Sequence, residues 1–365
     1  MIVKNDYHNC ITNLACSIQK YFGVEYKHDT LKDIDEILAR RQPKNVILLL
    51  YDGMGARIIE RNLPEDSFFI RNKLRDIYTV FPATTTAATT SVQSGLNPVE
   101  HGWLGWDCYV PPIDKVITLF REREKGSNEI SEEFLAVKEQ YAYKSIVTQI
   151  NEKGDDKAYS VSPFGDVKYE SIEEMMEKIS QLAHQDGRKF IYGYNSEPDS
   201  SMHDYGPDSP EVLKLIWQRN NLTEQLVKDI EDSIVIVIAD HGHKAVDTVY
   251  LTDYPDVLEL LERPTSVEPR AVSFKIKEGK HQLFEELFNK YFSDSFKLYT
   301  AEDVISSRLF GDGAEYRYFR QSLGDYLAIA YGDKVIRMDD SVCLYSEHAG
   351  YTDDEIYIPL IVVER

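Results

Sequence analysis

The feature that most constrains the fold is a set of short, nearly unbroken apolar runs. "NVILLLY" (45–51), "SIVIVIA" (233–239) and "IPLIVVE" (358–364) contain few polar residues. Runs of this kind are typical of strands that are buried on both faces. The stretches "DIYTVF" (76–81) and "KFIYGYN" (189–195) also resemble strands.

Helical patterns separate these runs. Residues 171–185 and 209–230 repeat apolar side chains at three- and four-residue spacing, as surface helices do. Alternation of such helices with buried strands predicts an α/β fold, with a mainly parallel central sheet flanked by helices on both faces. The pattern changes between about residues 250 and 345, where strand-like 271–277, helix-like 281–292 and strand-like 325–332 lie close together. We expect a single domain over 1–365, with a smaller inserted α+β cap at approximately 250–345.

The charge balance limits the binding partners. The chain has 62 acidic and 41 basic residues, a net charge of −21, whereas nucleic-acid polymers and anionic membranes select clustered positive charge. We therefore expect neither as a partner. The negative charge of the protein would repel a small anionic substrate unless the binding site were locally positive, and bound metal ions can make it so.

The cysteines and the N-terminal stretch bear on the cellular location of the protein. The 4 cysteines form no CxxC pair, and their spacing suggests no disulfide framework. The N-terminal stretch lacks the apolar core of a secretory signal, and no apolar run reaches the length of about 18 residues that a membrane helix needs. We expect a cytoplasmic protein, and the sequence does not establish its oligomeric state.

Acidic residues follow three of the predicted strands. Asp52 comes after 45–51, Asp199 follows 189–195 with His203 four residues later, and Asp240 and His241 follow 233–239. Ligands of open parallel sheets bind at the carboxyl ends of the strands, where these side chains can meet. Carboxylates and imidazoles suit Zn²⁺ or Mn²⁺. Taken one at a time, the aspartates are also explained by turns or loop caps, and His348 by an ordinary surface position.

The stretch "VFPATTTAATTSVQSG" (80–95) is rich in hydroxyl side chains. Pro82 suits the start of a helix, and Gly95 suits its end. A threonine at the helix start lies where unpaired N–H groups favour an anion, and a neighbouring metal would make it a nucleophile. The alternative is simple capping of the helix.

With these segments in view, the chain resembles the alkaline phosphatase superfamily, and within it the type I phosphodiesterase/nucleotide pyrophosphatase family. The resemblance covers 45–55, 80–106, 195–207, 237–242 and 346–351 in the family's order. It implies a catalytic threonine three residues after Pro82 and ten before Gly95, which is Thr85. It further implies two divalent metal ions, zinc with manganese as an alternative. Their implied ligands are Asp52, Asp240 and His241 for one ion, and Asp199, His203 and His348 for the other.

The chain departs from the family pattern at several positions. Trp106 stands where the family has an asparagine that contacts a phosphoryl oxygen, so we expect Trp106 to shape the substrate pocket. Thr86 replaces an aromatic residue that grips a nucleobase, whereas Tyr205 matches a base-stacking tyrosine, with loop packing as the alternative. Met202 replaces a glycine, and Ala349 interrupts a His-Gly pair.

The resemblance implies a metal-dependent phosphoric ester hydrolase, a phosphodiesterase or nucleotide pyrophosphatase acting through a phospho-threonine on a small phosphate ester or nucleotide. A phosphomonoesterase or phosphonate hydrolase of the same superfamily is the alternative. A non-catalytic metal-binding protein is a further one. The Cys/Ser-x-Pro-x-Arg signature of sulfatases and the G-x-S-x-G elbow of serine hydrolases are missing from the sequence.

Overall fold

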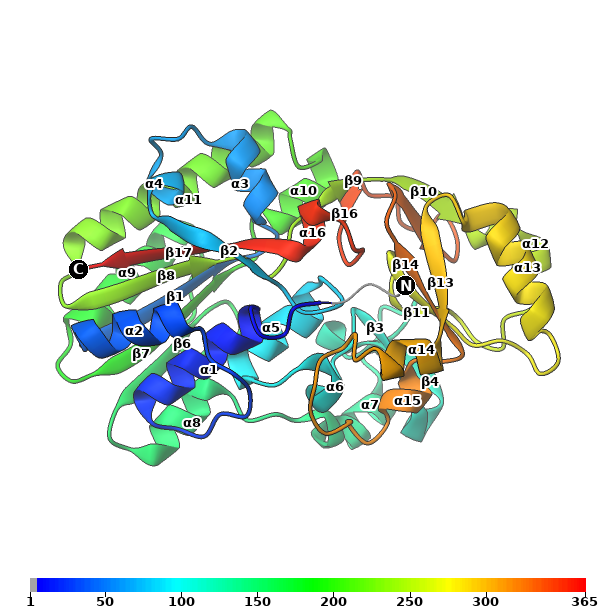
Figure 1. Cartoon of the computed structure of the whole chain (residues 1–365), viewed down its shortest axis with the longest axis horizontal. Coiled ribbons are helices and arrows are strands. Elements are labelled where there is room, and N and C mark those ends of the chain that lie inside the picture. Colours follow the sequence, from blue (N-terminus) through cyan, green and yellow to red (C-terminus); the bar gives the residue numbers. More distant parts are fainter. Residues whose placement is uncertain (1–4) are drawn as a thin grey trace.

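The computed structural model describes residues 5–365, which form two lobes placed side by side (Figure 1). The first lobe is built on a six-stranded sheet with the order β2-β17-β8-β1-β7-β6. Its strands are β1 (Asn45–Tyr51), β2 (Lys73–Tyr78), β6 (Lys157–Val161), β7 (Lys189–Asn195), β8 (Ser233–Ile238) and β17 (Tyr357–Glu364). Every residue of β1 and β8 is buried, as their apolar sequences predict.

The α/β class is confirmed, but the sheet that we expected to be mainly parallel is mixed. Strands β6, β7, β1 and β8 are parallel to one another, whereas β17 is antiparallel to both of its neighbours, β8 and β2. A parallel strand needs a crossover of a dozen or more residues, usually a helix. Only the short helix α16 (Asp353–Ile356) lies directly before β17. The chain therefore enters the sheet from the edge at which β1 and β8 end.

Helices pack on both faces of this sheet. Figure 1 shows α3, α4 and α11 on one side of the sheet and α1, α5 and α8 on the other. The predicted helices correspond to α9 and α11, whose first turns are capped by the hydroxyls of Ser171 and Ser209. The helices of this lobe are α1 (Ile11–Phe22), α2 (Lys32–Arg41), α3 (Ala56–Asn62), α4 (Phe68–Arg71), α5 (Thr85–Ser94), α8 (Ile146–Lys153), α9 (Ile172–His184), α10 (Asp199–Tyr205) and α11 (Pro210–Asp229).

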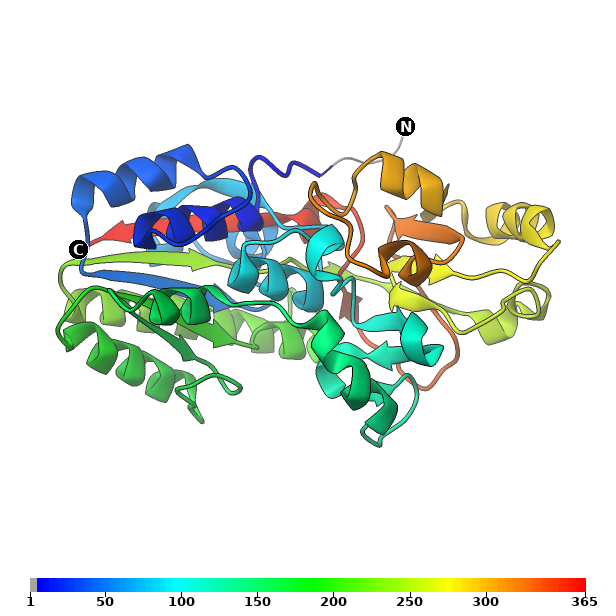
Figure 2. The same cartoon turned by 90° about the horizontal axis from the view of Figure 1, so that it is seen from below.

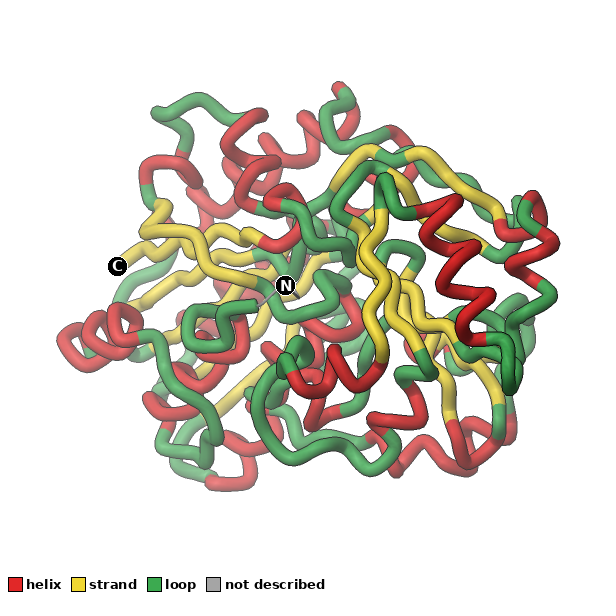
Figure 3. The backbone as a smooth tube through the Cα atoms, turned by 45° about the vertical axis from the view of Figure 1, so that its right-hand side comes forward, coloured by secondary structure: helices red, strands yellow, loops and turns green. Residues whose placement is uncertain are grey.

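The second lobe contains a seven-stranded antiparallel sheet, ordered β13-β14-β12-β11-β3-β4-β5. The region 250–345 supplies β11–β14, and the remaining strands come from residues 107–124. Figure 2 shows this lobe at the opposite end of the molecule from the C-terminus, and Figure 3 separates the strands of the two sheets. The strands are β3 (Asp107–Val110), β4 (Lys115–Thr118), β5 (Arg123–Glu124), β11 (Ser266–Glu268), β12 (Ala271–Phe274), β13 (Phe296–Thr300) and β14 (Tyr326–Ala330).

Both faces of the second sheet carry apolar cores. Along β14, Leu327 and Ile329 face one core, and Ala328 and Ala330 face the other, which is the alternation expected of a strand. Short helices and strands complete the lobe and its connections. They are α6 (Pro98–His101), α7 (Glu132–Val137), α12 (Pro255–Leu258), α13 (His281–Phe292), α14 (Ala301–Ser306), α15 (Phe319–Ser322), β9 (Lys244–Ala245), β10 (Asp247–Tyr250), β15 (Lys334–Arg337) and β16 (Ser346–Glu347).

Among the described residues, no helix has both the length and the apolar character that crossing a membrane requires.

Candidate metal centre and nucleophile

The order of the strands brings the predicted acidic residues together. Strand β1 lies between β8 and β7, so Asp52, Asp240 and Asp199 leave the sheet at one edge. Hydrogen bonds fix their spacing: the Gly53 N–H donates to Asp240 Oδ1 (3.0 Å), and the Asp199 N–H donates to the backbone oxygen of Asp52 (3.1 Å). The carboxylates therefore converge although they lie far apart in the sequence.

Asp52, Asp240 and His241 form a fully buried group, the inner cluster, whose ligand atoms lie within 4.8 Å of one another. His241 Nε2 is 3.4 Å from Asp52 Oδ1 and 3.6 Å from Asp240 Oδ2. Burial raises the pKa of Asp52 and of Asp240 well above the ordinary range. The carboxylate of Asp199 raises the pKa of Asp52 further, and that of Asp52 raises the pKa of Asp240 further. Asp240 Oδ2 is buried without a hydrogen-bond partner. A divalent cation would satisfy that oxygen and neutralise the repulsion, so these residues fit a metal ion.

The outer cluster consists of Asp199, His203, His243 and His348, again with ligand atoms within 4.8 Å. Asp199 Oδ1 lies 2.6 Å from His243 Nε2, 3.6 Å from His203 Nε2 and 3.9 Å from His348 Nε2. Burial alone would raise the pKa of Asp199, but the surrounding imidazoles hold it well below its usual range. One carboxylate among several imidazoles is a donor set that suits zinc.

Backbone carbonyls orient three of these imidazoles. Nδ1 of His203 lies 2.8 Å from the backbone oxygen of Ser346, Nδ1 of His241 lies 3.1 Å from that of Gly242, and Nδ1 of His348 lies 3.1 Å from that of Ala83. A carbonyl accepts only, so each Nδ1 carries a hydrogen, and Nε2 is the ring nitrogen that is left to bind a metal. All three Nε2 atoms approach carboxylates of the clusters. This is the tautomer that binds a metal through Nε2.

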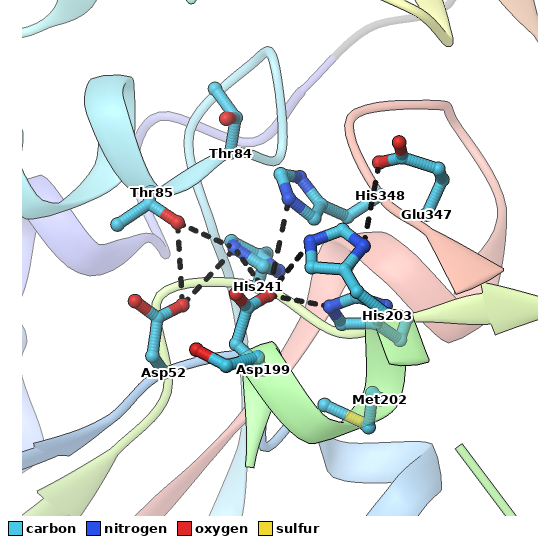
Figure 4. Close-up of polar contacts among 12 residues, drawn as sticks. Asp52, Thr84, Thr85, Asp199, Met202, His203, His241, Glu347 and His348 are labelled. Carbon is cyan, nitrogen blue, oxygen red and sulfur yellow. Dashed lines mark hydrogen bonds and ion pairs between the residues drawn. The ribbon is translucent and has the colours of Figure 1, made fainter. Parts of the chain in front are cut away.

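Thr85 is the first residue of α5, directly after the N-cap Thr84. Its Oγ1 lies 3.3 Å from Asp52 Oδ1 and 3.2 Å from His241 Nε2, and the side chain points into the inner cluster (Figure 4). The free N–H groups of the helix start and the helix dipole favour an anion at this end. Gly95 ends the helix in the left-handed conformation, as its position predicts.

The two clusters share one site. Asp199 Oδ1 of the outer cluster is 3.9 Å from His241 Nε2 of the inner cluster, and Figure 4 shows His241 beside Asp199 and His348. Thr85 and the six ligand candidates predicted from the sequence thus lie in one place.

The two predicted substrate-binding residues lie in different surroundings. Tyr205 ends α10 with 56% of its surface exposed. The Trp106 ring packs edge-on against Phe120, and the backbone N–H of Trp106 donates to Glu268 Oε1 (2.7 Å). Glu268, in β11 of the second lobe, also accepts a hydrogen bond from Thr84 Oγ1 (2.5 Å). The second lobe therefore reaches the start of α5.

Sequence reasoning missed three residues of the site. His243 follows His241 by two residues in the stretch "ADHGH" (239–243), and this spacing was a usable signal. The Tyr194 hydroxyl donates to Asp52 Oδ2 (2.5 Å), and Glu268 is a buried carboxyl whose pKa burial raises to about 8. Neither of the latter two lies in a recognisable motif. Their importance depends on packing between distant segments.

Comparison with known proteins identifies relatives of this arrangement. The family model described as "Type I phosphodiesterase / nucleotide pyrophosphatase" matches residues 46–340. Human ectonucleotide pyrophosphatase/phosphodiesterase family member 1 is 26% identical over an alignment of 180 residues, which covers 45% of this chain and 19% of that relative. The chain therefore matches about a fifth of the length of this curated protein.

Solved structures share the fold. Murine ectonucleotide pyrophosphatase/phosphodiesterase 5, as an inactive variant in complex with AMP, has a TM-score of 0.65 and 19% identity, covering 86% of this chain and 87% of that one. The human protein of the same name has a TM-score of 0.65 and 17% identity, with 87% of each chain covered. At sequence identities this low, the similarity to these structures shows a shared fold and nothing beyond it.

Proposed function

Since this chain belongs to the type I phosphodiesterase/nucleotide pyrophosphatase family, a family of phosphoric ester hydrolases, we propose that it hydrolyses phosphodiester or phosphoanhydride bonds through a phospho-threonine formed on Thr85. The observation that carries this proposal is the position of Thr85 Oγ1 at a helix N-terminus, 3.2 Å from His241 Nε2 and 3.3 Å from Asp52 Oδ1. A hydroxyl in that position can be deprotonated and can face an anion at the same time.

We propose two divalent ions, zinc with manganese as the alternative. The inner cluster would hold one ion, and Asp199, His203 and His348 the other. When bound, such ions lower the pKa of a neighbouring hydroxyl and stabilise charge on entering and leaving oxygens. They would also bring four positive charges to three carboxylates, which makes the site attractive to an anion within an acidic protein.

In this mechanism Thr85 Oγ attacks phosphorus in line, and the bond to the leaving alcohol or nucleotide breaks. The N–H groups at the start of α5 face the phosphoryl oxygens. Water then attacks phospho-Thr85, releasing phosphate or the remaining phosphate ester and restoring the hydroxyl. The carbonyls bonded to the imidazoles keep the ligand side chains in place through both steps.

A diester or pyrophosphate is the favoured substrate class. Among the described residues, no lysine or arginine bonds to Thr85 or to either cluster, so no fixed cation clamps a doubly charged monoester. The AMP bound to the murine relative supports a nucleotide as the substrate. Comparing hydrolysis of an aryl phosphodiester, a dinucleotide pyrophosphate, an aryl monoester and a phosphonate tests this choice. A strong monoester preference would reverse it.

Thr85→Ala tests the nucleophile. The variant is expected to lose covalent labelling by a substrate with radioactive phosphorus and to lose turnover by several orders of magnitude, because no other hydroxyl occupies that position. Its metal content should be unchanged, and Thr85→Ser should keep labelling and part of the rate. Undiminished hydrolysis by Thr85→Ala would remove Thr85 from the mechanism, whereas metal binding without hydrolysis of any of these substrates by the wild type would favour a binding protein.

We also propose that the protein is cytoplasmic, and fractionation of cells that express the chain would test this location.

A further inference from the structure

His348 is held differently from the other ligand candidates. Asp52 and Asp240 directly follow central strands, and Asp199 begins the helix after β7. His348 instead lies between β16 and α16, where the chain returns from the second lobe to the first. No strand of the six-stranded sheet ends at His348. The two-residue strand β16, which pairs with β9, holds the backbone just before it, and beyond His348 its place depends on what holds residues 348–352, which we call the His348 loop.

The His348 loop folds around a buried carboxylate. Glu355 has no exposed surface, and its side chain accepts hydrogen bonds from the Gly350 N–H (2.7 Å) and the Thr352 hydroxyl (2.7 Å). Its backbone oxygen accepts a bond from the Gly242 N–H (2.9 Å), next to His241. Glu355 therefore connects the loop to the segment that carries the inner cluster.

The loop conformation is not one that its sequence prefers. Ala349 has a φ of 82°, in the left-handed region, where a residue with a Cβ is disfavoured. The family pattern has glycine at this point, and glycine adopts the conformation without that cost. Contacts with the rest of the protein must therefore impose the conformation that places His348 in the outer cluster.

Arg270 supplies the positive charge for Glu355. This arginine is fully buried and belongs to the turn between β11 and β12 of the second lobe. Its guanidinium donates to both carboxylate oxygens, with Nε–Oε1 at 2.6 Å and Nη2–Oε2 at 2.9 Å. It also donates to the backbone oxygens of Gly332 and Lys334. This bidentate pairing fixes the orientation of the Glu355 carboxylate and also compensates its charge.

We infer that Arg270 is a positioning residue for the outer cluster: by holding Glu355, it keeps the His348 loop in the conformation that presents His348 Nε2 beside Asp199. This inference rests on the proposed metal centre. Without Arg270, Glu355 would be a buried charge with no cation. A proton or water would then compete for the oxygens that bind Gly350 and Thr352, and Ala349 would be free to leave the left-handed conformation.

The test measures metal binding without substrate. Arg270→Met and the milder Arg270→Lys are prepared in the full chain, loaded with Co²⁺, and titrated with a chelator while ions per chain and visible absorption are recorded. We expect the ion of the outer cluster to bind about 10–100-fold more weakly, as when the supporting partners of metal ligands are removed. The ion of the inner cluster should keep its affinity. Arg270→Lys keeps the charge and guards against a failure of Arg270→Met to fold.

A matched control is available in the first lobe. Arg188 makes a similar forked pair with Asp156 (2.8 and 2.6 Å), next to the first residues of β6 and β7 and so at the edge of the sheet opposite the clusters. Arg188→Met should lower stability and leave both ion affinities unchanged. Adding Ala349→Gly to Arg270→Lys should restore part of the lost affinity, because glycine needs less support in the left-handed conformation.

Unchanged affinity of the outer ion in Arg270→Lys, or an equal loss of both ions, would overturn the inference. Either result leaves the proposed hydrolase standing. A wild-type chain that binds no divalent ion would instead refute the proposed metal centre itself.

Discussion

The inner and outer clusters hold similar side chains but are built differently. The inner cluster lies directly at the ends of β1 and β8, in the middle of the sheet, and is fully buried. The outer cluster combines α10 with connections that pass to and from the second lobe, and His203 lies close to the surface. The position of the inner cluster therefore follows from the sheet alone, whereas the outer cluster needs both lobes.

The largest effect should come from the inner cluster. In Asp240→Asn a neutral amide replaces a carboxylate, and we expect turnover to fall by about 10²–10³-fold, the loss seen when one group that stabilises transition-state charge is removed. Steady-state rates in metal-saturated buffer measure this. Aspartate at position 240 would prove dispensable if excess zinc restored the full rate.

A smaller effect is expected from the outer cluster. His348→Ala should weaken binding of one ion by about 100-fold or more, above the 10–100-fold typical of supporting partners, while the other ion stays bound. Chelator titration followed by metal analysis measures the two affinities. Simultaneous loss of both ions would show that the clusters are not independent and would remove the distinction drawn above.

The smallest expected effect is on the free energy of unfolding of the metal-free protein, and the sign of this effect differs between the two clusters. The pKa of Asp240 is raised in the folded state, by burial and by Asp52. Its stabilising contribution is therefore fully present below the ordinary carboxyl range, and it is lost as the pH rises through the raised pKa. At neutral pH, metal-free Asp240→Asn should be more stable than the wild type, by on the order of 1 kcal/mol.

Asp199 should behave in the opposite way. Its pKa is lowered by the neighbouring imidazoles against the effect of burial, so it stabilises the fold above the ordinary carboxyl range and loses that contribution as the pH falls through the lowered pKa. Metal-free Asp199→Asn should be less stable than the wild type at neutral pH. Urea unfolding of both variants in the presence of a chelator compares them, and a shift of the same sign in both would contradict the assigned electrostatics.

Local pattern was enough to predict the inner half of the site. The apolar runs marked β1, β7 and β8, and the acidic residues after them lie where strand ends meet. The threonine-rich stretch likewise predicted α5, because Pro82 and Gly95 are local signals for its two ends. In these cases the residues that determine the structure are neighbours in the sequence.

The rest depends on contacts between distant segments. Nothing near Tyr194 indicates that its hydroxyl will meet Asp52, and nothing near Arg270 indicates that it will pair with Glu355. The direction of β17 was missed for a similar reason. An apolar strand reads alike in both orientations, and only the route of the chain through the second lobe decides between them.

The place of β17 also bears on how the molecule is made. This strand lies between β2 and β8, yet it is the last of them to leave the ribosome, and Tyr357 pairs with Tyr78 from far back in the chain. During synthesis β2 has no partner strand in the sheet until residues 357–364 emerge from the ribosome. Pairing over such sequence distances is slow. A nascent chain is thus exposed to wrong partners until residues 357–364 emerge, and chaperones that cover the unpaired edge of β2 would matter most during that interval.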